Sequence, residues 1–444
     1  MFLRAMSGIT TLPYWDFDPL IYEASMVGLG PAGSLACDVL ILLGAGLCIL
    51  ATARQPTDGA GKLWIGCAVL VGLGLEPILY HGWLGQWATI QQQRVGASWG
   101  SAMIAGLALM RLCRDDRYRA AVFAGVLGFV TVLALKGAHQ MLIEHPETVA
   151  DFKHNSEQIF AAQGWTPESS MAKGYQRRLM QNEATGWFGL SNVFASYGAM
   201  GVVGFAGLAL CVWREPRAQA RDARRAGHPN RGALIAASTG LLASIAAVAM
   251  AQSKGGTAVA LLGAAFLGLI LAIRFGKPRL LASRLATRPA LLRPLPIALT
   301  LVPLAAVVAR GLIGERLGEL SLLFRWFYMQ GATRIATGYE LNGVHVGNWL
   351  LGVGPDGFKD AYLVAKNPLN PEEIVSPHSI LFDWWADLGV FGLAWGALFF
   401  VWLWWIGAAI SPSLREGAGE RTEITGGASS DCRPFIRLVA AIPV

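Results

Sequence analysis

The sequence predicts an all-α membrane protein, a polytopic bundle of transmembrane helices. Hydrophobic residues make up 54% of the 444 residues and charged residues only 15%, a balance that favours lipid over water as the surrounding solvent. Apolar runs of about 20 residues, enough to cross roughly 30 Å of hydrocarbon, recur along the chain. The net charge of +7 comes from short basic clusters between these runs, so it indicates membrane topology and not a nucleic-acid partner.

Nine apolar runs are predicted to be spans, and two long polar segments interrupt them. The spans lie at residues 34–53, 63–81, 97–112, 119–136, 189–213, 232–252, 255–275, 293–312 and 380–407. The chain therefore divides into four N-terminal spans (1–136), a polar segment (137–188), four spans (189–312), a second polar segment (313–379), a last span (380–410) and a tail (411–444). The tail is Gly- and Ser-rich and is expected to be disordered and cytoplasmic. The first 33 residues hold no apolar core of signal-peptide length, so the first span is expected to direct insertion.

Basic residues orient these spans. Arginine-rich connections join spans three and four, five and six, and seven and eight, and basic residues in short connections are retained in the cytoplasm. The polar segments 137–188 and 313–379 then lie on the outer side of the membrane. Because binding and catalytic residues are concentrated in such connections, function is expected there.

The second outer segment carries more ionisable residues than a simple connection needs. Its first half, ERLGELSLLFRWFYMQGATRIATGYE, has helical spacing with a broad apolar side, which predicts a helix lying on or partly in the interface. Arg325 on that helix is either an arginine that snorkels to lipid headgroups or a functional cation. His378 follows Pro377 at the mouth of the last span, where a histidine is either a helix cap or a catalytic group.

Basic residues also stand in two other outer positions. The segment AQSKGGTA, residues 251–258, leaves almost no connection between spans six and seven. Lys254 is either an interfacial lysine in a tight turn or a cation that, with the amide of Gly255, binds an anionic headgroup. Arg177 and Arg178 in the first outer segment are either a solvated pair or phosphate ligands.

Four motifs resemble, in order, those of the O-antigen ligase and polymerase superfamily of bacterial envelope enzymes. ATGWFGLSNVFASYGAM, which includes Asn192, resembles that family's Gly-Phe-Gly-x-x-Asn entry to a span, and AQSKGGTAVALLGAAFLGLIL resembles its Ser-Arg-Gly turn. FRWFYMQGATRI followed by LLGVGPDGF resembles its Arg-x-x-Trp helix and Gly-x-Gly turn. PHSILFDWWADLGVFGL resembles its His-Asn-x-x-Leu motif before a Gly-x-x-Gly span. The resemblance runs from residue 184 to residue 396.

The resemblance implies a multi-span, GT-C-like glycosyltransferase of the inner membrane, with its site facing the periplasm and an undecaprenyl-diphosphate-linked glycan as donor. It implies that His378 is the catalytic histidine and that Arg325 and the turn cation bind the diphosphate. Lys254 stands where the family usually has arginine, Ser379 where it has asparagine, and Asp387 where it often has glutamate. Lysine keeps the charge but loses the bidentate fork of arginine, so a weaker phosphate contact is expected.

The residue types also suit transfer of a glycan from a lipid diphosphate to a hydroxyl. The leaving diphosphate carries negative charge, which Arg325 and Lys254 can bind. A hydroxyl acceptor needs a base of near-neutral pKa, which suits His378; in a second interpretation His378 positions the donor, and Asp383 or Asp387 is the base. Neither outer segment holds an Asp-x-Asp pair of the kind that fixes a divalent ion against a diphosphate, so a metal-independent reaction without a cofactor is expected.

The identity of the glycan acceptor and the function of the protein each have alternative interpretations. Ligation to lipid A core, polymerisation of a growing glycan and protein O-glycosylation share the donor, and nothing in the sequence separates them. A transporter of lipid-linked glycans would need inverted repeats and ionisable residues near the bilayer midplane. Glu76 is such a residue, and it is expected to be protonated and paired inside the bundle. A third interpretation makes the outer segments docking surfaces for envelope proteins.

Overall fold

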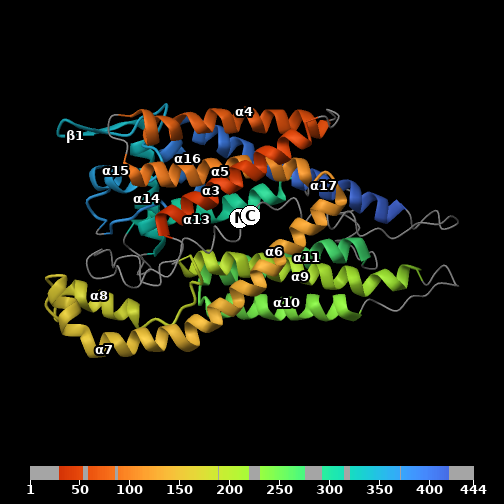
Figure 1. Cartoon of the computed structure of the whole chain (residues 1–444), viewed down its shortest axis with the longest axis horizontal. Coiled ribbons are helices and arrows are strands. Elements are labelled where there is room, and N and C mark those ends of the chain that lie inside the picture. The colour runs from red at the N-terminus through yellow and green to blue at the C-terminus, as the bar shows by residue number, and fades with distance from the viewer. Residues whose placement is uncertain are drawn as a thin grey trace. The chain divides into compact units, whose positions relative to one another are not determined.

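The computed structural model describes residues 30–53, 59–85, 89–188, 190–219, 231–275, 293–314, 321–370 and 372–419. Within these ranges the chain is helical, apart from connections and one two-stranded sheet (Figure 1). Seven of the described helices are long and apolar enough to cross a membrane. The prediction of an all-α, multi-pass membrane protein is therefore confirmed.

Each of the seven candidate spans overlaps a predicted apolar run. They are Gly33–Ala51, Trp64–Leu84, Gln92–Leu112, Arg117–Ala162, Ser191–Trp213, Arg231–Met250 and Leu295–Ile313. The predicted runs at 255–275 and 380–407 correspond to shorter apolar helices, Lys254–Gly268 and Val390–Trp405. The candidate Arg117–Ala162 has 46 residues, about twice what a bilayer crossing needs, so part of it must extend beyond the hydrocarbon.

The chain forms two compact units, and each is described by itself. The described part of unit 1 lies within residues 30–34 and 116–275, and that of unit 2 within residues 35–115 and 293–419. The helices of unit 1 are α6 (Asp116–His139), η2 (Gln140–Glu144, π-helical), α7 (His145–Ala162), α8 (Ser170–Leu179), α9 (Ser191–Gln219), α10 (Arg231–Met250) and α11 (Lys254–Phe275).

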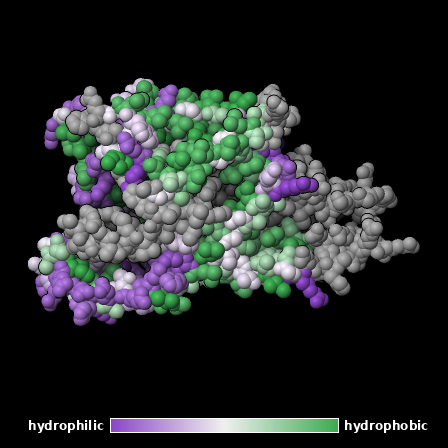
Figure 2. Space-filling model, in the orientation of Figure 1, coloured by the Kyte–Doolittle hydropathy of each residue, from purple (hydrophilic) through white to green (hydrophobic). Residues whose placement is uncertain are grey.

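Glycines let the helices of unit 1 pack closely. A Cβ on Gly240 of α10 would collide with the ring of Phe205 on α9, and a Cβ on Gly256 of α11 would collide with Ala195 of α9. α9 is therefore the central helix against which α10 and α11 pack. Beyond this bundle, α7 and α8 enclose a small aromatic core (Figure 1), and hydrophilic side chains gather over them (Figure 2).

Unit 2 contains the remaining helices and the sheet. They are α3 (Gly30–Ala51), α4 (Gly59–Leu79), η1 (Tyr80–Leu84, π-helical), α5 (Ile90–Leu112), α13 (Leu295–Ile313), α14 (Ser321–Thr337), β1 (Tyr339–Leu341), β2 (Val344–Val346), α15 (Phe358–Ala365), α16 (Ile380–Leu388) and α17 (Val390–Gly419). A helix is thus observed within the predicted interfacial segment, as α14, and the end of that segment is strand β1. β1 and β2 pair antiparallel, with Tyr339 opposite Val346.

The second predicted outer segment has a hydrophobic core of its own. Tyr328 and Ile335 of α14 pack there with Phe358 and Tyr362 of α15, and Ala386 of α16 completes the cluster. This core fixes α14 and α16 next to each other, and both helices carry candidate site residues.

The predicted last span is divided into two helices. Gly389 takes a left-handed φ of 58° between α16 and α17, a conformation that favours glycine. α17 then packs against α16, since a Cβ on Gly392 would collide with the Trp384 backbone and the rings of Trp384 and Trp395 lie 6.0 Å apart. α16 has nine residues and is not among the candidate spans.

Two acidic residues lie in the candidate spans of unit 2. Glu76 is exposed on α4, so the expectation that it is paired inside the bundle is wrong. Asp38 of α3 is instead buried, and the Ser101 hydroxyl of α5 donates to its Oδ1 at 3.1 Å. Asp38 was missed in the sequence because it lies within an apolar run that was predicted as a span.

Candidate functional site

His378 occupies a strained position directly before α16. Its φ is 55°, in the left-handed region that a side chain rarely adopts, and such strain is concentrated at functional sites. The backbone N–H of His378 donates to Ser376 Oγ at 3.2 Å, and the Ser376 hydroxyl donates to Asp383 Oδ2 at 3.1 Å. Ser376 therefore joins the histidine loop to the carboxylate one turn into the helix, whereas Ser379 makes no capping hydrogen bond.

The positive charge of Arg325 acts on His378. Arg325 lies partly buried on α14, which packs against α16. The His378 ring contacts Tyr328, also on α14, with ring centroids 5.6 Å apart. Desolvation by the surrounding protein and the positive charge of Arg325 both lower the pKa of His378, so the imidazole is neutral at pH 7 and able to accept a proton.

Asp383 and Asp387 stand one helical turn apart on α16. Burial raises the pKa of Asp383 to about 6, although the hydrogen bond from Ser376 opposes the shift. Asp387 is 5% exposed, and its pKa is raised well above the usual range by burial and then by the charges of Asp383 and Asp356. Burial therefore favours the protonated form of Asp387, while Asp383 ionises near pH 6.

The predicted Gly-x-Gly turn closes the end of α16. We call residues 352–354 the glycine turn; Gly352 and Gly354 have φ values of 68° and 80°. The Val353 N–H donates to Ala386 O at 3.0 Å, and the Gly354 N–H donates to Asp387 O at 2.9 Å. These amides satisfy the last carbonyls of the helix, so they are not available to bind a phosphate.

The candidate residues of unit 1 gather at the start of α11. Ser253 is buried, and its hydroxyl donates to Asn192 Oδ1 at 2.6 Å and accepts from the Gly256 N–H at 3.1 Å. Lys254 and Gly255, the next two residues, are exposed. The helix predicted to begin at residue 255 begins one residue earlier, at Lys254, and Asn192 holds the turn from α9.

Arg177 and Arg178 lie on α8 and are exposed. Arg178 Nη1 donates to Gln181 Oε1 at 3.4 Å. Arg325 and His378 belong to unit 2, whereas Lys254, Asn192 and the α8 arginines belong to unit 1. The candidates therefore form two sets. The set in unit 2 contains Arg325, His378, Asp383 and Asp387, and the set in unit 1 contains Asn192, Lys254 and Gly255.

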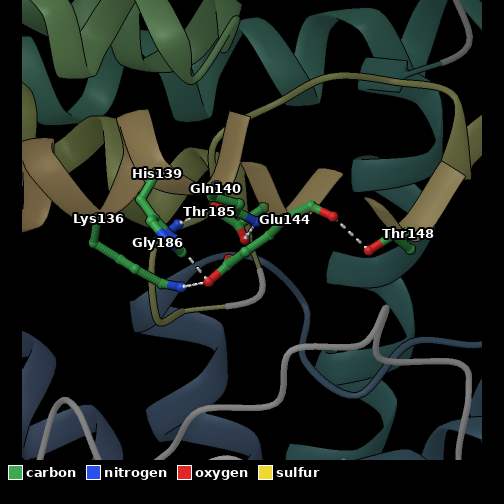
Figure 3. Close-up of polar contacts among 7 residues, drawn as sticks. All are labelled: Lys136, His139, Gln140, Glu144, Thr148, Thr185 and Gly186. Carbon is green, nitrogen blue, oxygen red and sulfur yellow. Dashed lines mark hydrogen bonds and ion pairs between the residues drawn. The ribbon is translucent and has the colours of Figure 1, made fainter. Parts of the chain in front are cut away.

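A polar cluster at η2, missed by the sequence reasoning, positions the segment that leads to Asn192 (Figure 3). The Gln140 side chain accepts from the N–H groups of Thr185 and Gly186, at 2.9 and 2.8 Å, and donates to Thr185 Oγ1 at 2.8 Å. Glu144 pairs with Lys136 and His139 on the neighbouring turn. The feature that brings these residues together is a π-helical turn, which amino-acid composition does not reveal.

A metal site needs several ligating side chains close together. In the described part of the chain, no three or more His, Cys, Asp or Glu side chains are arranged to hold a metal ion. Asp16 and Asp18 form an Asp-x-Asp pair that the sequence reasoning passed over, and they lie outside the described residues. The expected metal independence therefore stays a prediction.

No protein-family model, curated protein or solved structure matches this chain. The chemistry of the two residue sets therefore carries the functional argument.

Proposed function

We propose that this protein is an O-antigen ligase-like, GT-C-like glycosyltransferase with nine spans in the bacterial inner membrane. In this proposal it moves a glycan from an undecaprenyl-diphosphate donor to a hydroxyl acceptor at the periplasmic face. The observation that carries the proposal is the neutral His378 beside the Arg325 guanidinium, with Asp383 joined to the histidine loop through Ser376. A base next to a cation suits a reaction that removes a proton and releases an anion.

In the proposed reaction the acceptor oxygen forms a bond to the anomeric carbon of the donor sugar. The bond from that carbon to the diphosphate oxygen breaks, and its electron pair leaves with the diphosphate. His378 takes the hydroxyl proton, or Asp383 takes it while His378 positions the donor. Arg325 stabilises the negative charge that develops on the leaving group.

Lys254 and Gly255 are assigned to diphosphate binding in the same proposal. Both are exposed at the first turn of α11, where backbone amides and the helix dipole favour an anion. Ser253 satisfies the Gly256 amide and is itself held by Asn192, so the turn is preorganised while Lys254 is exposed on it. Arg177 and Arg178 are secondary candidates for the same anion.

The acceptor is proposed to be lipid A core, with a growing glycan and protein as alternatives. A polysaccharide polymerase and a protein O-oligosaccharyltransferase would use the same donor and the same residue roles. The membrane lipid itself surrounds the candidate spans in each case.

A transporter of lipid-linked glycans is the second candidate function, and buried Asp38 is the observation that favours it. This carboxyl stands in an apolar helix and binds Ser101, and ionisable residues inside membranes mark transport pathways in many proteins. Asp38→Asn would impair movement of the donor across the membrane if transport were the function, and it would leave transfer by a purified enzyme intact otherwise.

The test is glycan transfer in a deletion strain complemented with wild type, His378→Ala or Arg325→Ala. Envelope fractions are blotted for glycan on lipid A core, on protein and as free polymer, with membrane levels of each variant measured in parallel. His345→Ala is the matched control, because His345 is exposed in the same unit and pairs with Glu340 at 3.1 Å. Loss of one product in both site variants at normal abundance supports the proposal and names the acceptor. Full activity in both variants contradicts it.

A further inference from the structure

Gln140 begins the π-helical turn η2, which joins α6 to α7. This turn is wider than a regular helical turn, because the His145 N–H donates to Gln140 O five residues back. The Gln140 side chain is partly buried and meets the connection between α8 and α9 (Figure 3). We call residues 182–186 of that connection the bridge segment. π-helical turns often occur at functional sites, and this one holds the chain just before Asn192.

The side-chain amide of Gln140 binds the bridge segment through three hydrogen bonds. Its Oε1 accepts from the N–H groups of Thr185 and Gly186, at 2.9 and 2.8 Å, and its Nε2 donates to Thr185 Oγ1 at 2.8 Å. The carbonyl oxygen therefore uses both of its lone pairs. Gly186 has a φ of 59°, and a Cβ there would collide with Phe194 of α9. The bridge segment is thus held against α9 as well as against η2.

The bridge segment is also bonded to the connection that precedes Lys254. The Ala184 N–H donates to the carbonyl of Met250, the last residue of α10, at 3.0 Å. Gln252 Nε2 donates to Asn182 O at 2.9 Å. Because Ala184 is fully buried, water does not compete for its amide. Hydrogen bonds therefore lead from η2 through the bridge segment to the end of α10.

We propose that Gln140 is a positioning residue for the anion-binding turn of unit 1. Through the bridge segment it holds the end of α10, and so it sets where Lys254 and Gly255 stand at the start of α11. Gln140 does not touch the donor in this scheme. Its effect on donor affinity rests on the proposed glycan transfer, whereas its hold on the bridge segment does not.

Four variants separate the role of the amide from simple space filling. Gln140→Met keeps the length of the side chain and removes its hydrogen bonds. Gln140→Glu keeps an oxygen that can accept from both N–H groups, and Thr185→Val removes only the contact of the hydroxyl. Gln158→Met, on an exposed position of α7, is the matched control. A residue that only filled space would tolerate methionine.

The first readout is amide hydrogen exchange of the full chain in lipid nanodiscs. The Thr185 and Gly186 amides are expected to exchange about tenfold faster in Gln140→Met, because each loses its hydrogen bond. The Ala184 amide, which is bonded to the end of α10, is expected to exchange faster as well. Exchange is expected to stay close to that of wild type in Gln140→Glu and in Gln158→Met, and to change less in Thr185→Val than in Gln140→Met.

The second readout is the donor KM in glycan transfer. It is expected to rise about fivefold in Gln140→Met, the equivalent of one net hydrogen bond, with kcat little changed, and to recover in Gln140→Glu. In a Lys254→Gln background the same substitution is expected to raise KM no further, because the contact that Gln140 positions is already absent. A general loss of structure would instead lower kcat and add to the effect of Lys254→Gln.

Unchanged exchange of the Thr185 and Gly186 amides in Gln140→Met overturns the proposal. An unchanged donor KM also overturns it, and so does a rise in KM that adds in full to that of Lys254→Gln. If the wild-type protein transfers no glycan, the proposed function fails, and the positioning role in that reaction falls with it. The exchange result still decides separately whether Gln140 holds the bridge segment.

Discussion

The candidate groups of unit 1 are exposed on a preorganised turn, whereas in unit 2 Asp387 is buried, Asp383 and Arg325 are partly buried, and His378 is exposed before α16. Lys254 and Gly255 are exposed at the start of α11. Hydrogen bonds among the neutral residues Ser253, Asn192 and Gly256 hold the turn that carries them. In unit 2, by contrast, burial and neighbouring charges shift the pKa values of His378, Asp383 and Asp387.

The difference separates two chemical tasks. An exposed ammonium on a rigid turn suits reversible binding of an anion, because binding then needs little desolvation of the protein. A carboxyl with a pKa of about 6, Asp383, and a neutral histidine suit transfer of a proton, because each can accept one near neutral pH. Unit 1 should therefore govern the affinity for the donor, and unit 2 should govern the rate and its pH dependence.

The largest effect is expected for Gly389→Ala in unit 2. The new Cβ would collide with the Leu350 carbonyl and the Gly352 amide at a φ of 58°, so the carboxyl end of α16 could not form. We expect loss of transfer and a strong fall in thermal stability in detergent. Gly338→Ala is the control, since it has a φ of 79° but open space around it and should cost only about 1–2 kcal/mol. Equal damage by both would show that backbone strain alone, and not the contact with the turn, matters.

Asp383→Asn should have the next largest effect and should be visible as a change of pH profile. The carboxyl is protonated below a pKa of about 6, so if it accepts the proton the wild-type rate rises with pH through that value. The substitution should lower the rate about hundredfold or more and remove this limb. A limb that persists in Asp383→Asn would assign it to His378, whose pKa lies below its ordinary value.

The same carboxyl should affect stability with a definite sign. Its folded pKa of about 6 lies above the ordinary 3.8, so the folded protein keeps a proton that the unfolded chain releases. Stability should therefore fall as pH rises from about 4 to 6, and this fall should be smaller in Asp383→Asn. Melting temperatures of both proteins across that range provide the measurement, and parallel curves would contradict the assignment.

A smaller effect, confined to donor affinity, is expected in unit 1. Lys254→Gln should raise the donor KM about tenfold through the loss of one charge-assisted hydrogen bond, with kcat nearly unchanged. Lys254→Arg should keep or raise activity because arginine can bind a diphosphate bidentately. Lys173→Gln on exposed α8 is the matched control. If Lys254→Gln transfers glycan like wild type, the phosphate role of this turn is wrong.

The smallest effect is expected when Arg177 and Arg178 are both changed to glutamine. Both are exposed, and exposed charges are screened at physiological salt. Transfer should stay within about twofold of wild type at 0.15 M salt. A larger loss, accompanied by a steep salt dependence in the wild type, would add α8 to the donor-binding surface of unit 1.

The sequence by itself determined the membrane class, the positions of the spans and the helix that carries Arg325. Those properties depend on hydropathy and spacing within one segment, which a run of 20 residues records. It also predicted the tight connection at residues 251–258, because two apolar runs stand almost next to each other there.

Tertiary structure alone decided what surrounds the candidate groups. The run at 380–407 is apolar throughout, and glycine is common in membrane helices, so nothing local marks the break at Gly389. Arg325 acts on His378 only because helices distant in the sequence, α14 and α16, pack together. Burial then sets the protonation of Asp383 and Asp387, because desolvation depends on every neighbouring segment and not on the residues beside them in the chain.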